Sequence, residues 1–343
     1  MFQTKSYKNT FAILFIALII VTIINISLGS VYIPFKQVLA VFFNQEVDNE
    51  SWKTIILNLR LPKAITAIIV GSGLSISGLL MQTIFRNPLA GPFVLGISSG
   101  ASLGVAVLIL GASFLGANIM SYSFTTWGLA VAASLGAFLV LASVMVAAVK
   151  VRNTMSILII GLMFGSLTSA VISILAYFSS AAQLQQFMFW SFGSLGSLSW
   201  NEIISLFIIF SIGILMVVFI IKPLNGLLIG ENYARSLGIN VKRTRNITLI
   251  ATSILTGVIT AFSGPIAFIG LAVPHIAKLL FTTSNHKTLI PAVAINGAII
   301  MLICDSISQL PTSEYTLPIN AITSLFGAPI IIWLLVRKRK IHY

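Results

Sequence analysis

Charged residues are scarce in this sequence. Only 8% of its 343 residues are charged, whereas 57% are hydrophobic, and the mean hydropathy is +1.04. A soluble globular domain carries about 25% charged residues, and a disordered chain needs low hydrophobicity, so both classes are excluded. The apolar content requires a bilayer as the solvent. We therefore expect an all-α integral membrane protein, because helices satisfy their own backbone hydrogen bonds in lipid.

Residue types that build catalytic and metal sites are also scarce. The single Cys304 excludes an internal disulfide and a thiolate metal cluster. The three histidines, His275, His286 and His342, stand in unrelated contexts, so we expect no metal site and no catalytic cluster. No Gly-Lys dipeptide occurs, which excludes a phosphate-binding loop. We expect no enzyme activity and no cofactor in this chain, so any driving energy must enter through another subunit.

Acidic residues are outnumbered by basic ones, 7 to 20. In a membrane protein this excess needs no nucleic-acid partner, because basic residues collect in cytoplasmic loops. The uncharged runs between them are long enough for ten spans of roughly 20 residues each. The predicted spans are about 11–29, 64–84, 93–112, 127–149, 157–178, 203–221, 247–263, 266–281, 289–310 and 319–336.

Ten spans place both termini on one side of the membrane. That side carries 16 of the 20 basic residues, and the other side carries Lys36, Lys53, Arg60 and Lys63. This asymmetry assigns both termini to the cytoplasm. The 16 residues are Lys5, Lys8, Arg86, Lys150, Arg152, Lys222, Arg235, Lys242, Arg243, Arg245, Lys278, Lys287, Arg337, Lys338, Arg339 and Lys340.

Few ionisable residues lie within the predicted spans. They are Asp305, His275 and Lys278. An ion-coupled secondary transporter usually needs membrane carboxylates or broken helices near the midplane, and this chain has one such carboxylate. A secondary transporter therefore remains an alternative, and a membrane enzyme is a more remote one.

One polar segment interrupts the hydrophobic part of the chain. Lys222 to Arg245 is predicted to be a cytoplasmic loop, and within it Glu231 to Leu237 reads as two helical turns that stop at Gly238. Glu231 and Arg235 form an i, i+4 pair, as do Tyr233 and Leu237 on the other side. The segment is either a solvated connector or a helix that presents an apolar knob to a cytoplasmic partner.

Small residues recur along three predicted spans. Each stripe either allows close helix packing or lines a wide path for a bulky solute, and different helices can do different things. The stripes are Gly96, Gly100 and Gly104; Gly161, Gly165, Ser169 and Ser173; and Gly71, Gly73 and Gly78.

Ten blocks of this sequence, in order along nearly the whole chain, resemble one family. It is the FecCD-type, or type II, ABC importer family, whose permease subunits move ferric siderophores, haem and cobalamin. The blocks are Arg60-Leu-Pro-Lys63, Gly71 to Gln82, Arg86 to Ala90, Leu95 to Ala101, Trp190 to Trp200, Gly230 to Gly238, Gly264 to His275, Asp305, Leu317 to Ile319 and Leu325 to Pro329.

The resemblance implies a single permease domain over residues 1–343, with 222–245 as its coupling loop. Its ten helices would form two halves related by inverted pseudo-symmetry, in a bacterial cytoplasmic membrane. A second permease, two ATP-binding subunits that hold ATP and Mg²⁺, and an extracytoplasmic substrate-binding protein would complete the importer. We expect a ferric siderophore as substrate; haem or cobalamin remain open.

The resemblance also implies roles for individual residues. Coupling to the ATPase falls on Glu231, Tyr233, Ala234, Arg235, Leu237 and Gly238. A cytoplasmic gate falls on Asn87, Pro88, Leu89, Thr154 and Met155. Docking of the binding protein falls on Arg60 and Lys63, for which snorkelling to lipid phosphates is the alternative.

The sequence departs from the family near its end. The family commonly pairs the Asp at position 305 with an Arg four residues later, and it has Glu-Leu-Pro-Ile-Gly further on. This chain has Gln309 and Thr316-Leu-Pro-Ile-Asn320 instead. Two charged positions are therefore missing, and we expect a related but distinct permease to supply them in a heterodimer.

Overall fold

The computed structural model describes residues 7–29, 31–112, 125–150, 154–196, 198–309 and 315–336. Several predicted features lie outside these ranges, among them Lys5, Arg152, part of the turn after Gly111 and the basic residues 337–340. All regular structure in the described part is helical. The helices are α1 (Lys8–Ser27), α2 (Phe35–Phe42), α3 (Glu50–Ile55), α4 (Leu61–Phe85), α5 (Ile97–Ile109), α8 (Thr126–Lys150), α9 (Thr154–Tyr177), α10 (Ala181–Ser191), α11 (Trp200–Ile229), α12 (Glu231–Ser236), α13 (Val241–Ser263), α14 (Ile269–Phe281), α15 (His286–Ser308) and α16 (Ile319–Val336).

Every predicted span coincides with one of these helices. Seven helical segments are long and apolar enough to cross a membrane, including the continuous 36-residue helix Glu50–Phe85. Three further apolar helices, α5, α14 and α16, are shorter. The all-helical class is confirmed, whereas the crossing of all ten helices stays a prediction. The sequence did not predict α2 and α3, which lie between the first two spans.

The predicted loop Lys222 to Arg245 contains more helix than α12. Helix α11 continues through Lys222 and Pro223 to Ile229, and α13 already begins at Val241. Charge ended the predicted spans, but the helices extend beyond the apolar region into the polar zone. The connection is therefore little more than α12 itself. A second short helix, α10, was predicted at about 182–192 and is found at Ala181–Ser191.

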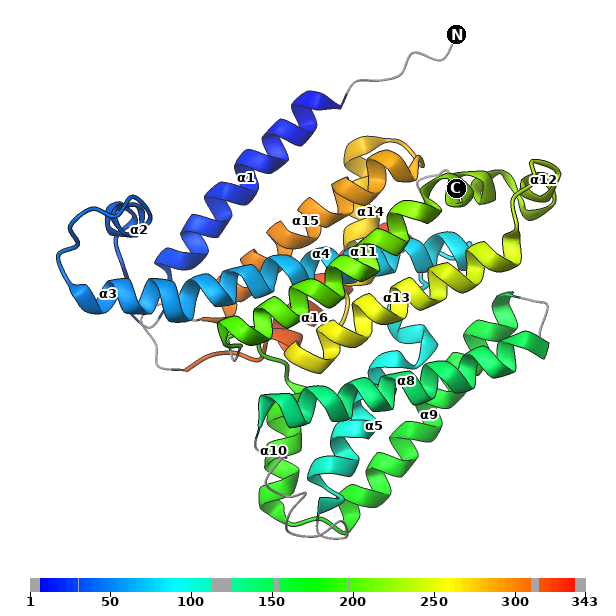
Figure 1. Ribbon diagram of the computed structural model, residues 1–343, viewed down its shortest axis with the longest axis horizontal. Coiled ribbons are helices and arrows are strands. Elements are labelled where there is room, and N and C mark those ends of the chain that lie inside the picture. The colour runs from blue at the N-terminus through cyan, green and yellow to red at the C-terminus, as the bar shows by residue number, and fades with distance from the viewer. Residues whose placement is uncertain are drawn as a thin grey trace.

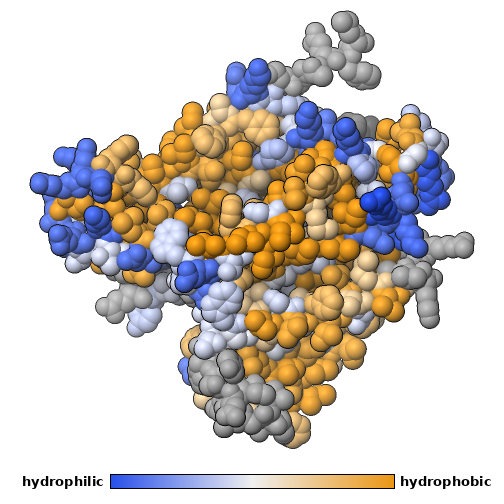
Figure 2. Space-filling view, in the orientation of Figure 1, coloured by the Kyte–Doolittle hydropathy of each residue, from blue (hydrophilic) through white to orange (hydrophobic). Residues whose placement is uncertain are grey.

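Helix α4 is the centre of the bundle. It packs against α11, α13, α14 and α15, and most of its side chains are buried (Figure 1). Helices α5, α8, α9 and α10 form a second group, which joins the first through α13 (Figure 1). The surface carries a broad hydrophobic area, with hydrophilic residues over α3 and over α12 at opposite ends (Figure 2). This pattern suits a protein that spans a bilayer.

Contacts between helix termini define the two ends of the bundle. At the α12 end, the centroids of the Tyr7 and Phe281 rings are 5.3 Å apart, and the Arg86 guanidinium donates a hydrogen bond to the Leu227 carbonyl. At the opposite end, here called the Asp305 end, Lys63 pairs with Asp305. Helix α4 starts at the Asp305 end and α13 starts at the α12 end, so they run in opposite directions, as predicted (Figure 1).

Basic residues segregate between the two ends as the sequence predicted. Within the described residues, the basic positions assigned to the cytoplasm lie on or near helix ends at the α12 end, and the other four lie on α2, α3, the helical turn Ile56–Arg60 and the start of α4. The α12-end residues whose side chains are described are Lys8, Arg86, Lys222, Arg235, Lys242, Arg243, Arg245, Lys278 and Lys287.

The three small-residue stripes prove to differ. A Cβ added to Gly104 would lie 1.9 Å from the Ala132 carbonyl oxygen, and one added to Gly78 would lie 1.6 Å from that of Gly270. The stripes on α5 and α4 therefore serve close packing against α8, α14 and α15. The stripe on α9 is divided: Gly161 is buried and its carbonyl oxygen lies 3.0 Å from where a Cβ on Gly96 would be, whereas Ser169 and Ser173 are exposed and donate to their own helix backbone.

We expect Gly78→Ala to destabilise the protein while Gly165→Ala leaves its stability nearly unchanged. The added methyl group at position 78 meets backbone of α14, which cannot move aside without displacing the helix, and overpacking of this kind costs about 1–3 kcal/mol. At Gly165 the nearest atom is the Ser99 hydroxyl at 3.4 Å. Thermal unfolding in detergent compares the two variants, and equal midpoints would contradict the packing account.

Candidate functional site

Helix α12 ends in a well-defined cap. The Gly238 N–H donates to the Arg235 carbonyl and the Ile239 N–H to the Ala234 carbonyl, both at 3.0 Å. This pair of hydrogen bonds is a Schellman motif, which needs a residue in the left-handed backbone conformation. Gly238 supplies that residue, with φ +79°. The predicted stop at Gly238 is confirmed. The backbone of the short helix is thus fixed by its own sequence.

One face of α12 is anchored and the other is open. Ala234 is fully buried against the bundle, and α12 contacts both α11 and α13. Tyr233 and Leu237 are 51% and 57% exposed. Glu231 and Arg235 approach to 3.6 Å as predicted, but both are exposed, so the pair contributes little stability. The result is a firmly seated helix with two exposed apolar side chains.

The helix ends beneath α12 are tied together by polar contacts. The Arg86 guanidinium donates to the Leu227 carbonyl at 2.8 Å, joining α4 to the last turn of α11. The buried His286 ring lies 2.8 Å from both Thr83 Oγ1 and Asn225 Oδ1, joining α15 to α4 and α11. The last turns of α11, which lead into α12, are therefore bonded to α4 and α15. Nothing in the sequence pattern revealed the His286 contacts, because their partners lie far along the chain.

The first predicted gate segment is a structured turn after α4. The Asn87 side chain accepts from the Leu89 N–H at 2.9 Å, and His275 on α14 donates to the Pro88 carbonyl at 2.9 Å. Leu89 is 42% exposed. His275, singled out from the sequence as an ionisable residue, thus supports the turn.

The second predicted gate segment lies at the start of α9. Met155 is half exposed there, and the side chain of Thr154 lies outside the described residues. The short helical turn Pro92–Leu95 that follows the first gate segment packs against α9. The turn that follows the first gate segment is therefore packed against the helix on which the second gate segment lies.

A buried polar network occupies the Asp305 end. Asp305 is 1% exposed, and its carboxylate pairs with Lys63 Nζ at 3.1 Å. It also accepts hydrogen bonds from Asn25 Nδ2 at 2.9 Å and Gln309 Nε2 at 2.8 Å. The network joins α1, α4 and α15. Gln309 thus takes the place that the family gives to an arginine, and it does so within this chain.

Arg60 is turned inward, which the sequence did not predict. It is 9% exposed, and its guanidinium donates to the carbonyls of Ile26 at 2.8 Å, Ser27 at 2.9 Å and Val31. It therefore caps the C-terminal end of α1, where a cation also suits the helix dipole. Lys63 likewise has an internal partner. Both predicted docking residues are engaged inside the chain, and their docking role stays a prediction.

We expect Arg60→Gln to destabilise the protein much more than Lys53→Gln. Loss of the guanidinium leaves buried carbonyl oxygens without donors, at about 1–3 kcal/mol for each such group. Lys53 is exposed at the same end of the bundle and serves as the matched control. Thermal unfolding in detergent measures the difference. If both variants unfold together at the wild-type midpoint, the capping role is wrong.

The sequence matches a known family. The model of the FecCD transport family matches residues 17–337, nearly the whole chain. The chain belongs to the FecCD transport family. Family members of this kind are permease subunits of ABC importers rather than enzymes, and the ATPase is a separate subunit. Such a permease implies ATP-binding subunits and a substrate-binding protein as partners.

Individual relatives agree with the family assignment. The chain is 35% identical over 283 residues to the vitamin B12 import system permease protein BtuC of Citrobacter koseri, covering 82% of this chain and 83% of that protein. It is 35% identical over 328 residues to the ABC transporter permease protein YvrB of Bacillus subtilis, covering 93% and 90%. A solved structure, an inward-facing conformation described as that of a metal-chelate type ABC transporter, matches with a TM-score of 0.84 and 28% identity, over 96% of this chain and 100% of that one.

Proposed function

We propose that this FecCD permease moves a ferric siderophore through a bacterial cytoplasmic membrane, driven by ATP hydrolysis in a separate subunit that docks on α12. The observation that carries the proposal is the exposed pair Tyr233 and Leu237 on an otherwise anchored helix. An apolar pair of this kind is suited to a protein partner rather than to water. The α12 end would then face the cytoplasm, both termini with it, and all ten apolar helices would cross.

We infer the substrate class from the bulk of the solute that such a path would suit, and not from polar side chains that would recognise it. The exposed side chains of α9 are small, such as Ser169 and Ser173, or apolar, such as Leu167, so this helix presents few specific polar groups to a passing solute. Such a path suits a bulky metal chelate whose selection is made by the binding protein. Cobalamin is the second candidate, because the names of the BtuC relatives include vitamin B12, which is cobalamin.

Uptake by cells tests the substrate. Cells that lack the gene for this permease are supplied with the permease and its ATPase. They are then given radiolabelled ferric siderophores, ferric haem or cobalamin in turn. We expect ferric siderophore uptake to return. Restoration of cobalamin uptake alone would assign the second candidate and overturn the first.

We further propose that the working unit is a heterodimer with a related permease. The charged position missing at Thr316 supports this assignment, whereas Gln309 already bonds Asp305 within this chain. The unpartnered face of α9 offers a surface for a second membrane chain. Affinity purification with the genomic neighbours present should recover two kinds of permease. A functional importer containing this chain as its one kind of permease would refute the heterodimer.

The remaining site assignments are proposals of the same kind. Asn87, Pro88 and Leu89, with Thr154 and Met155, would constrict the α12 end of the path. Arg60 and Lys63 would approach the binding protein at the Asp305 end only after their internal bonds loosen. Tighter docking at low ionic strength, lost when Lys63 is replaced by Met, would support that role; salt-independent docking would exclude it.

A further inference from the structure

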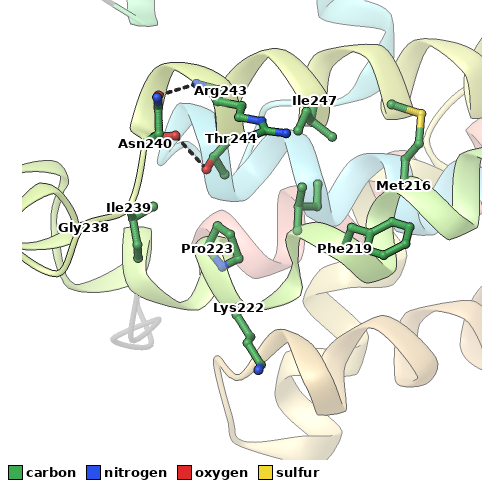
Figure 3. Close-up of a pocket in the computed structure, with 11 residues that line it drawn as sticks. Met216, Phe219, Lys222, Pro223, Gly238, Ile239, Asn240, Arg243, Thr244 and Ile247 are labelled. Atoms are coloured by element: carbon green, nitrogen blue, oxygen red, sulfur yellow. Dashed lines mark hydrogen bonds between the residues drawn. The ribbon is translucent and has the colours of Figure 1, made fainter.

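A groove lies between α11 and α13 near the α12 end (Figure 3). Its volume is about 750 Å³, within the range of about 300–1,000 Å³ that small-molecule sites occupy. The wall from α11 includes Met216, Phe219 and Ile220, and α13 contributes Ile247. Phe219 is 74% exposed. The deep part of the groove is therefore apolar and open to the surroundings of the bundle.

The outer part of the groove carries positive charge. Lys222 extends from α11 and Arg243 from α13, with Asn240 beside Arg243 (Figure 3). Both basic side chains are exposed, and within the described residues neither forms an ion pair with a carboxylate. The exposed Asn240 accepts a hydrogen bond from the Arg243 backbone N–H at 2.9 Å, and within the described residues the guanidinium makes no hydrogen bond of its own. The groove thus joins two unneutralised cations to an apolar floor.

The backbone of α11 adds an acceptor to the same groove. Pro223 lies within the helix and has no N–H, so the carbonyl of Phe219, one turn earlier, lacks its usual helical donor. Both residues line the groove. A carbonyl at membrane depth is costly when it lacks a donor. A ligand with hydroxyl groups would satisfy it.

The position of the groove determines what can enter it. It opens on two helices that are long and apolar enough to cross a membrane, at the level where each passes into its basic end. The molecules at that level are lipid headgroups, and the apolar floor continues toward the acyl chains. Basic pockets between membrane helices at the cytoplasmic side are suited to anionic lipid headgroups.

We propose that the groove binds one anionic phospholipid from the leaflet at the α12 end. The lipid phosphate pairs with Arg243, and the flexible Lys222 side chain, which points away from Arg243 in Figure 3, turns toward it. A headgroup hydroxyl donates to the Phe219 carbonyl, and an acyl chain covers Met216, Phe219 and Ile247. Because the groove also includes Gly238 and Ile239, which cap α12, the bound lipid supports the seat of that helix.

Lipid titration of the purified full-length chain in detergent tests the proposal by native mass spectrometry. The probes are phosphatidylglycerol and phosphatidylcholine with the same acyl chains. We expect wild-type protein to retain phosphatidylglycerol more tightly. The double variant Lys222→Gln with Arg243→Gln should bind it roughly thirtyfold more weakly, since each surface cation near an anionic lipid contributes about a factor of five.

Two further variants keep this experiment decisive. Lys242→Gln removes the same charge from an exposed neighbour that does not line the groove, and it should bind phosphatidylglycerol within about twofold of wild type. Phe219→Ala should weaken both lipids, because it removes apolar floor. Equal retention of the two lipids by wild type, or wild-type binding by the double variant, would overturn the proposal. So would a double variant that keeps the lipid but loses the ATPase, since the groove would then be a subunit interface.

Discussion

Leu237→Asp should abolish the coupling of this permease to its ATPase while leaving the fold intact. Leu237 is 57% exposed in the single chain, so the substitution disturbs no core. Burial of such a side chain in a partner is worth about 1.5–3 kcal/mol, and a buried carboxylate without a partner adds a further penalty. We therefore expect the ATPase to dock at least about tenfold more weakly. Co-purification and uptake measure the loss.

Asn232→Asp is the matched control for this experiment. It places the same charge on α12, on an exposed residue one position before Tyr233, in the first turn where an acidic group is favourable. This variant should dock the ATPase and support uptake near the wild-type level. Wild-type docking by Leu237→Asp would remove α12 from the coupling path. Equal loss in both variants would show general charge repulsion rather than a lost apolar contact.

Asp305→Ala should cause the largest loss of stability among single substitutions at the Asp305 end. The carboxylate is 1% exposed, and its removal leaves Lys63 without its ion-pair partner and the Gln309 amide without its acceptor. Breaking a buried pair by removing one partner typically costs about 3–5 kcal/mol. Asn25 keeps bonds to Leu302 and Ser306, so the link to α1 weakens rather than disappears.

Thermal unfolding in detergent measures this effect, with Glu231→Ala as the control. Glu231 also belongs to an ion pair, in its case with Arg235 at 3.6 Å. That pair is exposed, so it is worth at most about 1 kcal/mol. We expect a large fall in the unfolding midpoint for Asp305→Ala and almost none for Glu231→Ala. Matching midpoints for the two variants would mean that the buried network does not hold the bundle together.

The features that sequence reasoning predicted best depend on local pattern. Hydrophobic runs located the seven long apolar helical segments and the three shorter helices α5, α14 and α16 of the described part, because a span is a property of consecutive residues. The α12 helix and its stop at Gly238 were predicted because Glu231, Arg235 and the glycine act within two turns. The predicted span 203–221 is shorter than helix α11, because a formal charge ends a predicted span whereas the helix continues to Ile229.

The features that sequence reasoning missed depend on contacts between distant segments. Arg60 reads as an external cation until α1 is placed beside it, 34 positions earlier. The three partners of Asp305 come from three helices, and the family comparison identified Gln309 as a departure without showing that it still bonds Asp305. Small-residue stripes look alike in sequence, and only the neighbouring helix decides whether Gly78 is crowded or Gly165 is open.

The central claim is that ATP, and no ion gradient, drives substrate through this permease by way of α12. Proteoliposomes containing the permeases and the ATPase test it directly, with labelled ferric siderophore and its binding protein on the Asp305 side and ATP on the α12 side. We expect accumulation that requires ATP, survives collapse of proton and sodium gradients, and is lost with Leu237→Asp. Accumulation driven by an imposed ion gradient without ATP would contradict the account.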